Sequence, residues 1–305
     1  MRHVLTLFEL SAEEIKRIFA ISIDLKTNLQ RGVREAILPG RVLAMLFEKP
    51  SLRTRVSFEA GIAHLGGTSL FLGADVGWGK RESIEDFASV LGQYADAIVC
   101  RSNSHKKVEE LAKFAGCPVI NGLTEKAHPC QALADLLTLQ EYFGSLTGRK
   151  LAFVGDANNV ANSLAVCCGK LDMEFAIASP QGYQFDKSFL AELHRNVPGL
   201  KLTQTTDPIE AVKGSCAVYT DVWTSMGQEA EQEVRAKAFL PYQVNAKLMS
   251  YAPREARFLH CLPAKRGEEV TEDVIDGPQS AVIEEAANRM HAQKGLLAWI
   301  LGALE

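Results

Sequence analysis

The sequence contains no long run of apolar residues. Its first segment, MRHVLTLFELSAEEIKRIF, interrupts short apolar stretches with Glu, Lys and Arg, and it has neither the apolar core nor the small-residue cleavage site of a signal peptide. Elsewhere no apolar stretch approaches the roughly 20 residues that span a bilayer. These absences argue against secretion and against a membrane span, so we expect a cytoplasmic protein that has no membrane partner.

Metal-binding and nucleotide-binding motifs are also missing. The 7 cysteines are scattered without CxxC or Cys/His ligand spacing, and the adjacent Cys167 and Cys168 suit buried thiols better than a disulfide. Neither GxxxxGK[ST] nor GxGxxG follows a predicted strand, which disfavours a nucleotide-dependent oxidoreductase. We therefore expect reduced cysteines and no metal.

Neither sign of charge is in large excess. The chain has 305 residues and a net charge of −4, so its overall balance suggests neither a nucleic acid nor an anionic membrane as a partner. Hydrophobic residues make up 47% of the chain and charged residues 23%, as in ordinary globular proteins. This length is enough for two domains, each with its own buried core.

What the sequence does contain is an alternation of short apolar runs with segments of helical apolar spacing. The predicted strands are 41–47, 69–72, 97–100, 118–120, 151–154, 174–178, 216–220 and 258–259, and the predicted helices include one capped by Ser11, 83–94, 106–114, one that ends at Phe143, and 281–304. This alternation predicts an α/β fold in which parallel sheets are flanked by helices on both faces.

The stretch GSLTGRK at 144–150 separates two such series of elements. The long C-terminal helix has no second half of its own to pack against, and we expect it to return to the first domain. The predicted domains are therefore 1–143 together with the C-terminal helix at about 285–305, and 150–284.

Donor side chains are crowded into EKPSLRTRVSFE (Glu48–Glu59), where a predicted strand gives way to a helix. The first turn of a helix exposes unpaired N–H groups and a partial positive charge, and Arg53 and Arg55 add donors that match phosphate or carboxylate oxygens. The other interpretation is that Ser51 caps the helix and the arginines pair with Glu48 or Glu59. These residues alone favour an anion site without excluding that interpretation.

The motif HPCQ (His128–Gln131) also follows a predicted strand and begins a helix. His128 and Gln131 are three residues apart, so both can face one point beyond the carboxyl end of the strand, where open parallel sheets bind ligands. A single histidine at such a place is more often a structural cap than a catalyst, and both interpretations stay open.

Three motifs of the second half lie at strand ends in the same way. They are GDANNVANSL (Gly155–Leu164), TDVWTSMG (Thr220–Gly227) and HCLP (His260–Pro263). Asn159 suits an amino-acid group or a helix cap, Asp221 suits an ammonium group or a turn, and Cys261 suits a nucleophile, a polar contact or a buried site. Because these motifs follow successive strands, we expect them to gather at one sheet edge and to border a cleft between the domains.

With SLRTR, HCLPAKRGEE and EAANRMHAQKGLL, these motifs occur in the order and spacing of the ornithine carbamoyltransferases, a family that the chain resembles over nearly its whole length. SLRTR and HPCQ mark transcarbamylases in general, whereas SMG and HCLP are specific to the ornithine branch. The resemblance implies that the first predicted domain binds carbamoyl phosphate and the second binds ornithine, with two interdomain helices between them. It also implies no cofactor, and a homotrimer, or a multiple of trimers, with active sites shared between subunits.

The implied reaction transfers the carbamoyl group of carbamoyl phosphate to the δ-amine of L-ornithine, giving citrulline and phosphate for arginine biosynthesis. An acceptor such as acylated ornithine, or a non-catalytic relative that binds carbamoyl phosphate, is the alternative. The resemblance assigns carbamoyl phosphate to Ser51, Leu52, Arg53, Thr54, Arg101, His128, Gln131, Cys261, Leu262 and Arg289, and ornithine to Asn159, Asp221, Ser225 and Met226. The implied catalytic residues are Arg101, His128, Asp221 and Cys261.

One segment departs from the family pattern. Relatives commonly have a Gln that reaches the phosphate of a neighbouring subunit where this chain has Gly77, beside Trp78. Either Lys80 or Arg81 replaces that Gln, or Trp78 shapes the pocket of the second substrate. The segment therefore bears on the choice of acceptor.

Overall fold

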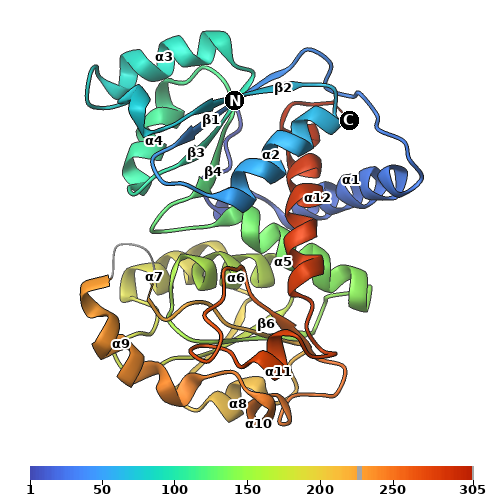
Figure 1. Ribbon diagram of the computed structural model, residues 1–305, viewed down its shortest axis with the longest axis vertical. Coiled ribbons are helices and arrows are strands. Elements are labelled where there is room, and N and C mark those ends of the chain that lie inside the picture. The colour runs from blue at the N-terminus through green and yellow to red at the C-terminus, as the bar shows by residue number, and fades with distance from the viewer. Residues whose placement is uncertain (225–228, 304–305) are drawn as a thin grey trace. The chain divides into compact units, whose positions relative to one another are not determined.

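The computed structural model describes residues 1–224 and 229–303 (Figure 1). The chain divides into two compact units, Met1–Leu137 with Ala287–Glu305 and Thr138–Ala286. The boundaries between the units fall inside the helices α5 (Pro129–Phe143) and α12 (Val282–Ile300). Among the described residues, no helix combines the length and the apolarity that crossing a membrane requires.

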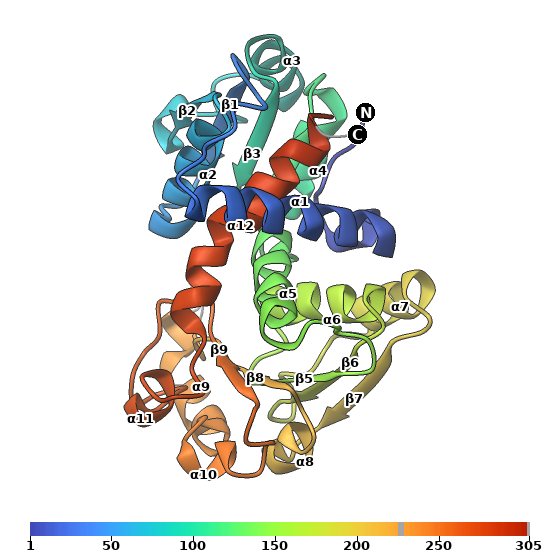
Figure 2. The ribbon, with the colours of Figure 1, turned by 90° about the vertical axis from the view of Figure 1, so that its right-hand side faces the viewer.

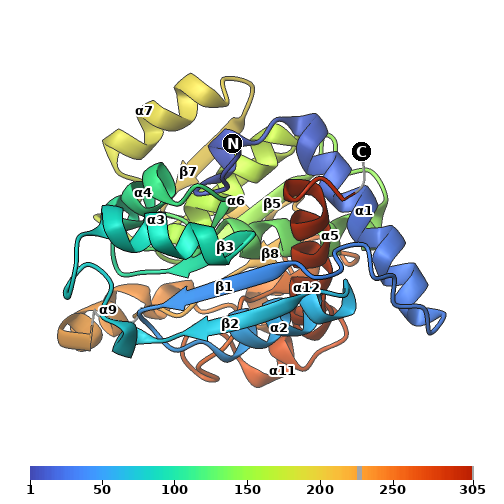
Figure 3. The same cartoon turned by 90° about the horizontal axis from the view of Figure 1, so that it is seen from above.

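The first unit is built on a parallel sheet with the strand order β2-β1-β3-β4. Figure 3 shows β2 at the sheet edge beside β1. The strands are β1 (Val42–Phe47), β2 (Thr68–Leu72), β3 (Ala97–Arg101) and β4 (Val119–Leu123). The helices that precede α5 are η1 (Leu7–Glu9), α1 (Ala12–Gln30), α2 (Leu52–His64), η2 (Ala74–Val76), α3 (Ile84–Tyr94) and α4 (His105–Phe114), where η marks a 3-10 helix.

Helices cover both faces of this sheet, with α2 on one side and α3 and α4 on the other (Figure 1). On the α3 and α4 side, Ala44 and Ile98 of the sheet belong to one buried cluster with Leu91 and Leu111. On α2, Phe58 is fully buried. Except for Val42 at the start of β1, every apolar residue of β1 and β3 is buried, which explains why both strands read as continuous apolar runs.

Close backbone approach also fixes the helices of this unit. A Cβ atom on Gly295 of α12 would lie 2.0 Å from the Ser22 Oγ of α1, and one on Gly92 of α3 would lie 1.4 Å from the carbonyl oxygen of Ala115. Only glycine fits at either position. The helix α1 itself begins with a capping box, in which Ser11 Oγ accepts from the N–H of Glu14 at 3.2 Å and Glu14 Oε2 accepts from the N–H of Ser11 at 2.8 Å.

The helix α12 carries a buried histidine, His291, that lies near several positively charged side chains. The His291 side chain is 8% exposed, and burial, assisted by Lys26, Lys294 and His64, lowers the pKa of His291 to about 4. The buried imidazole is therefore neutral at physiological pH.

This burial predicts a loss of stability in acid. Between pH 6.5 and pH 4 the unfolded chain takes up a proton on His291 that the folded chain refuses, so the free energy of unfolding falls by up to about 3 kcal/mol as the pH falls through that window. Above pH 6.5 this contribution is absent. His291→Gln removes the group, and denaturant unfolding at pH 7 and pH 4.5 should show a smaller acid loss than in the unsubstituted protein. The exposed His194→Gln is the control, and an equal acid loss in both variants would contradict the assignment.

The second unit contains a five-stranded parallel sheet with the strand order β7-β6-β5-β8-β9. The helices α6 and α7 lie on one face, with α8 and α10 on the other (Figure 2). The strands are β5 (Lys150–Val154), β6 (Glu174–Ala178), β7 (Lys201–Thr205), β8 (Ala217–Tyr219) and β9 (Arg257–Leu259). The helices are α6 (Asn159–Lys170), α7 (Lys187–Asn196), α8 (Pro208–Val212), η3 (Glu229–Glu231), α9 (Gln232–Phe239), η4 (Leu240–Tyr242), α10 (Ala246–Met249) and α11 (Glu272–Ile275).

These two helix-flanked parallel sheets confirm the predicted fold class. All eight predicted strands are present, whereas the strand β7 was missed. It lies at a sheet edge with most of its side chains exposed, so it has no apolar run that would mark it in the sequence.

Candidate functional site

In the first unit, the segment Ser51–Arg55 forms the N-terminal turn of α2. Ser51 has extended backbone angles and caps the helix by accepting from the N–H of Thr54 at 3.3 Å. Leu52 is 75% exposed, and Arg53 follows it in the same turn, half-buried. The capping interpretation and the anion interpretation are compatible, because the cap satisfies one N–H group and leaves the others of the first turn available.

The two arginines of the segment have different surroundings. Arg55 Nε donates to Glu59 Oε1 at 3.0 Å, and its guanidinium lies 3.7 Å from the centre of the Phe71 ring. Within the described residues, Arg53 forms no ion pair. Pairing with Glu59 therefore accounts for Arg55 and not for Arg53.

Two further guanidinium groups converge on one hydroxyl. Arg101, the last residue of β3, donates from Nη1 to Thr54 Oγ1 at 3.5 Å, and Arg289 of α12 donates from Nη2 to the same oxygen at 3.2 Å. The side chains of Thr54, Arg101 and Arg289 are 1%, 6% and 2% exposed. The two guanidinium groups present several N–H donors and two positive charges at one place, an arrangement that suits a bound anion with several oxygens.

The HPCQ motif lies beside these groups. Gln131 accepts from Arg289 Nη1 at 2.6 Å through Oε1 and donates from Nε2 to the buried Asp135 at 2.8 Å. Burial first, and then the positive charges of Arg289 and Arg101, hold the pKa of His128 well below its usual range. His128 is therefore a neutral imidazole at physiological pH, able to donate a hydrogen bond without adding a third positive charge.

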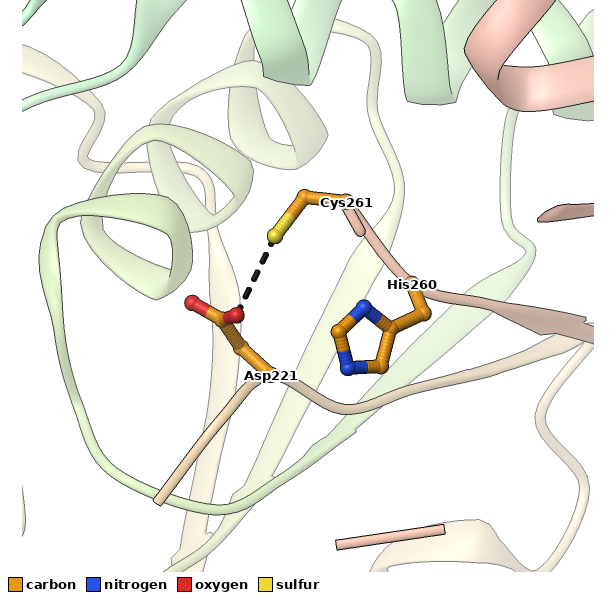
Figure 4. A group of neighbouring side chains, drawn as sticks. All are labelled: Asp221, His260 and Cys261. Carbon is orange, nitrogen blue, oxygen red and sulfur yellow. Dashed lines mark hydrogen bonds between the residues drawn. The ribbon is translucent and has the colours of Figure 1, made fainter. Parts of the chain in front are cut away.

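In the second unit, the residues that follow β5, β8 and β9 gather around Asp221. Its Oδ1 atom accepts from the N–H of Val222 at 2.8 Å and from Cys261 Sγ at 3.1 Å, the contact drawn in Figure 4. Its Oδ2 atom accepts from Asn158 Nδ2 at 2.7 Å. Asp221 is 8% exposed, so these bonds fix a buried carboxylate at the carboxyl edge of the sheet.

Asn158 takes the capping role that the sequence left open for asparagine in this motif, and it also holds Asp221. Its Oδ1 atom caps α6 by accepting from the N–H groups of Val160 and Ala161, at 3.0 and 3.1 Å. Its Nδ2 atom holds Asp221. The predicted Asn159 is the first residue of α6, next to this cap.

Behind Cys261, two buried carboxylates that the sequence did not single out hold His260. The Nδ1 atom of the His260 ring accepts from the N–H of Leu262 at 2.9 Å, so Nε2 carries the proton and donates to Glu269 at 3.1 Å. The N–H of His260 donates to Glu285 Oε2 at 2.9 Å. Neither carboxylate lies in a strand, and each is 0% exposed only because of tertiary packing.

The ligand atoms of Asp221, His260 and Cys261 lie within 4.8 Å of one another, a spacing that could hold a metal ion. However, both ring nitrogens of His260 are engaged, so whichever of them bound the ion would have to give up its hydrogen bond. The arrangement suits a hydrogen-bonded pocket for an ammonium group better than a metal centre.

The structure thus distributes the predicted residues between the two units. Thr54, Arg101, His128, Gln131 and Arg289 come together in the first unit, where Ser51, Leu52 and Arg53 form the adjacent helix turn. Asp221 and Cys261 meet in the second unit, which also contains Asn159 and Leu262, so the predicted contacts of Cys261 and Leu262 with carbamoyl phosphate stay predictions. Ser225 and Met226 lie outside the described residues.

Comparison with known proteins assigns the chain to a family. The model of the carbamoyl-P binding domain of aspartate/ornithine carbamoyltransferases matches residues 2–141, and that of the Asp/Orn binding domain matches residues 147–300. The chain is 53% identical to an ornithine carbamoyltransferase of Bacillus subtilis over 303 residues, which cover 98% of this chain and 94% of that protein. A solved structure, the ornithine carbamoyltransferase from Pyrococcus furiosus, superposes with a TM-score of 0.96 at 48% identity and covers 100% of this chain and 98% of that one. The chain therefore belongs to the aspartate/ornithine carbamoyltransferase family.

Proposed function

We propose that the protein transfers the carbamoyl group of carbamoyl phosphate to the δ-amine of L-ornithine, releasing citrulline and phosphate. The observation that carries this proposal is the convergence of the Arg101 and Arg289 guanidinium groups on Thr54, beside the neutral His128. This set suits a ligand that joins a phosphate to a polar carbonyl group. The Asp221 carboxylate supplies the counter-charge that the ammonium group of an amino acid requires.

The proposed mechanism begins with the protonation state of the attacking amine. An alkyl amine like that of ornithine has a pKa of about 10.4, so only its neutral minority attacks the carbamoyl carbon. Holding that amine against the carbon replaces a bimolecular encounter with an oriented one. Attack creates an oxyanion, for which Thr54, Arg101 and His128 are the donors. The carbon–oxygen bond to phosphate then breaks, and the departing phosphate takes the proton that the amine loses.

Arg53 and the N–H groups of the first turn of α2 stabilise the phosphate, both bound and leaving. In the second unit, Asn159, Ser225 and Met226 hold the amino-acid end of ornithine together with Asp221, while Cys261 and Leu262 contact the carbamoyl group. The hydrogen bond between Cys261 and Asp221 supports a joint role of these two residues in orienting the amine.

We also propose that the protein assembles as a homotrimer, or as a multiple of trimers, in the cytoplasm and serves arginine biosynthesis. Apolar side chains exposed on α2 and on the edge strand β2 support a subunit contact there, namely Leu52, Val56, Leu70 and Phe71 at 75%, 50%, 46% and 38% exposure. None of the 7 cysteines is joined in a disulfide, which fits a reducing compartment. Light scattering should give the mass of three chains or of a multiple of three.

The activity is tested with purified protein, carbamoyl phosphate and a panel of amines containing ornithine, N-acetylornithine, putrescine and lysine. We expect phosphate and a ureido product in equal amounts with ornithine, relative to a control without amine. Turnover with N-acetylornithine alone would move the acceptor to an acylated ornithine. Absence of turnover with every amine would overturn the enzymatic function.

A further inference from the structure

Glu48, the residue that directly follows β1, bonds to the end of β3 with both its main chain and its side chain. Its N–H donates to the carbonyl oxygen of Arg101 at 2.8 Å. Its Oε2 atom accepts from Ser102 Oγ at 2.6 Å and from the N–H of Asn103 at 3.0 Å. These bonds extend the pairing of the two strands past their last paired residues, Phe47 and Arg101.

The two segments joined in this way carry the proposed anion-binding groups. Glu48 lies three residues before Ser51, the cap of α2, and its bonds hold the carbonyl group of Arg101 and the two residues that follow it. Because Arg101 reaches Thr54 in the first turn of α2, the separation of the two segments determines whether these groups meet on one ligand. Glu48 therefore sets the spacing of the site without belonging to the groups that converge on Thr54.

A carboxylate at this place would repel a phosphate, and the structure neutralises it. Lys107 Nζ of α4 lies 2.8 Å from Glu48 Oε1, and the two side chains are 32% and 15% exposed. Burial acts to raise the pKa of Glu48, but the bonds from Lys107, Ser102 and Asn103 outweigh it and hold the pKa below its usual value. Glu48 is thus ionised at neutral pH, and its charge is balanced by one lysine.

Trp78, which departs from the family pattern, places its ring next to the Lys107 ammonium group. The Trp78 side chain is 2% exposed, packs against Phe87 at a ring distance of 6.3 Å, and has Lys107 Nζ 5.1 Å from its ring centre. Gly79, at φ +65°, lets the chain turn beside Lys107 Nζ. The Trp78 ring therefore belongs to the core of this unit, and its predicted part in shaping the pocket of the second substrate stays a prediction.

We propose that Glu48 is a positioning residue for the carbamoyl phosphate site, and that Lys107, held under Trp78, cancels the repulsion between the Glu48 carboxylate and the bound phosphate. This inference rests on the proposed function for the identity of the ligand. The hydrogen bonds of Glu48 hold the two segments of the site together, whereas its negative charge repels the bound phosphate. Mutations that change the charge and keep the hydrogen bonds separate these two effects.

The test measures the affinity for inorganic phosphate by calorimetry, together with KM for carbamoyl phosphate and for the amine. Lys107→Met leaves the carboxylate uncompensated, and we expect phosphate affinity to fall and KM for carbamoyl phosphate to rise, each about tenfold, with KM for the amine within about twofold. Lys106→Met removes the same charge from an exposed neighbouring position of α4 and should change none of these values by more than about twofold.

Two further variants separate positioning from a general loss of stability. Glu48→Gln keeps acceptors for Ser102 and Asn103 and removes the repulsion, so phosphate affinity should stay within about threefold of the unsubstituted protein. The double variant Glu48→Gln with Lys107→Met should recover most of the affinity that Lys107→Met loses. If the ion pair only stabilised the fold, Glu48→Gln and Lys107→Met would instead lose phosphate affinity equally.

Unchanged phosphate affinity in Lys107→Met, or a double variant as weak as Lys107→Met, would overturn the inference. Because phosphate binding is measured without turnover, failure of the proposed activity would appear separately, as absence of product from the unsubstituted protein. If that protein bound no phosphate, the anion site and the inference would both be wrong.

Discussion

Arg53→Ala is expected to weaken carbamoyl phosphate binding by about thirtyfold or more while the fold stays intact. Removing one partner of a close charged contact costs about 2–5 kcal/mol, and each 1.4 kcal/mol corresponds to a factor of ten. The fold should survive because, in the part of the chain that the structure describes, Arg53 makes no ion pair and lies half-buried on a surface turn. Calorimetry with inorganic phosphate, together with the thermal unfolding midpoint, measures both expectations.

Arg55→Ala is the matched control for this prediction. It removes the same side chain two residues further along the same helix, where the guanidinium pairs with Glu59 and lies over Phe71. We expect its phosphate affinity to stay within about threefold of the unsubstituted protein, because an exposed ion pair contributes little. Equal losses in the two variants would mean that only the general positive potential of α2 matters, and full affinity in Arg53→Ala would refute the assignment.

The architecture could be predicted because buried parallel strands leave a direct signature in the sequence. Strands such as β1 and β3 are covered on both faces and therefore appear as apolar runs bounded by helical spacing. The edge strand β7 lacks that cover and was missed. The parts of the fold that depend on local chemistry, such as the Ser11 capping box, were equally accessible, since their partners lie three residues apart.

The site could be predicted only in part, because each motif was ambiguous by itself. Placement after successive strands gathered Asp221 and Cys261 correctly, since the carboxyl ends of parallel strands meet at one edge. The supports of these residues could not be found in this way. Glu48 and Lys107 are 59 positions apart, and Glu269 reaches His260 only because both are packed in the interior. Such pairs depend on tertiary distances that no local pattern encodes.

Asp221→Asn is expected to lower kcat/KM for ornithine by a factor on the order of a hundred to a thousand, with the affinity for phosphate nearly unchanged. The substitution removes the negative charge that would face the substrate amine. Losing one partner of such a charged contact costs about 2–5 kcal/mol of binding free energy, as for Arg53→Ala. It also turns one acceptor into a donor. Because Oδ1 and Oδ2 both accept bonds, from Cys261 and Val222 on one side and from Asn158 on the other, either orientation of the new amide points N–H toward an existing donor.

Asp207→Asn is the control for the same chemical change in the same unit. Asp207 caps α8 from an exposed position by accepting from the N–H of Ile209 at 2.9 Å, and asparagine caps helices about as well as aspartate. Its kcat/KM should therefore match that of the unsubstituted protein. If Asp221→Asn kept more than about a third of the original kcat/KM, the buried carboxylate would be a structural anchor for Asn158 and Cys261 alone. If Asp221→Asn instead lowered phosphate affinity as strongly as kcat/KM for ornithine, Asp221 would act on both substrates. A group that contacts only the amine should lower kcat/KM for ornithine and leave phosphate affinity unchanged.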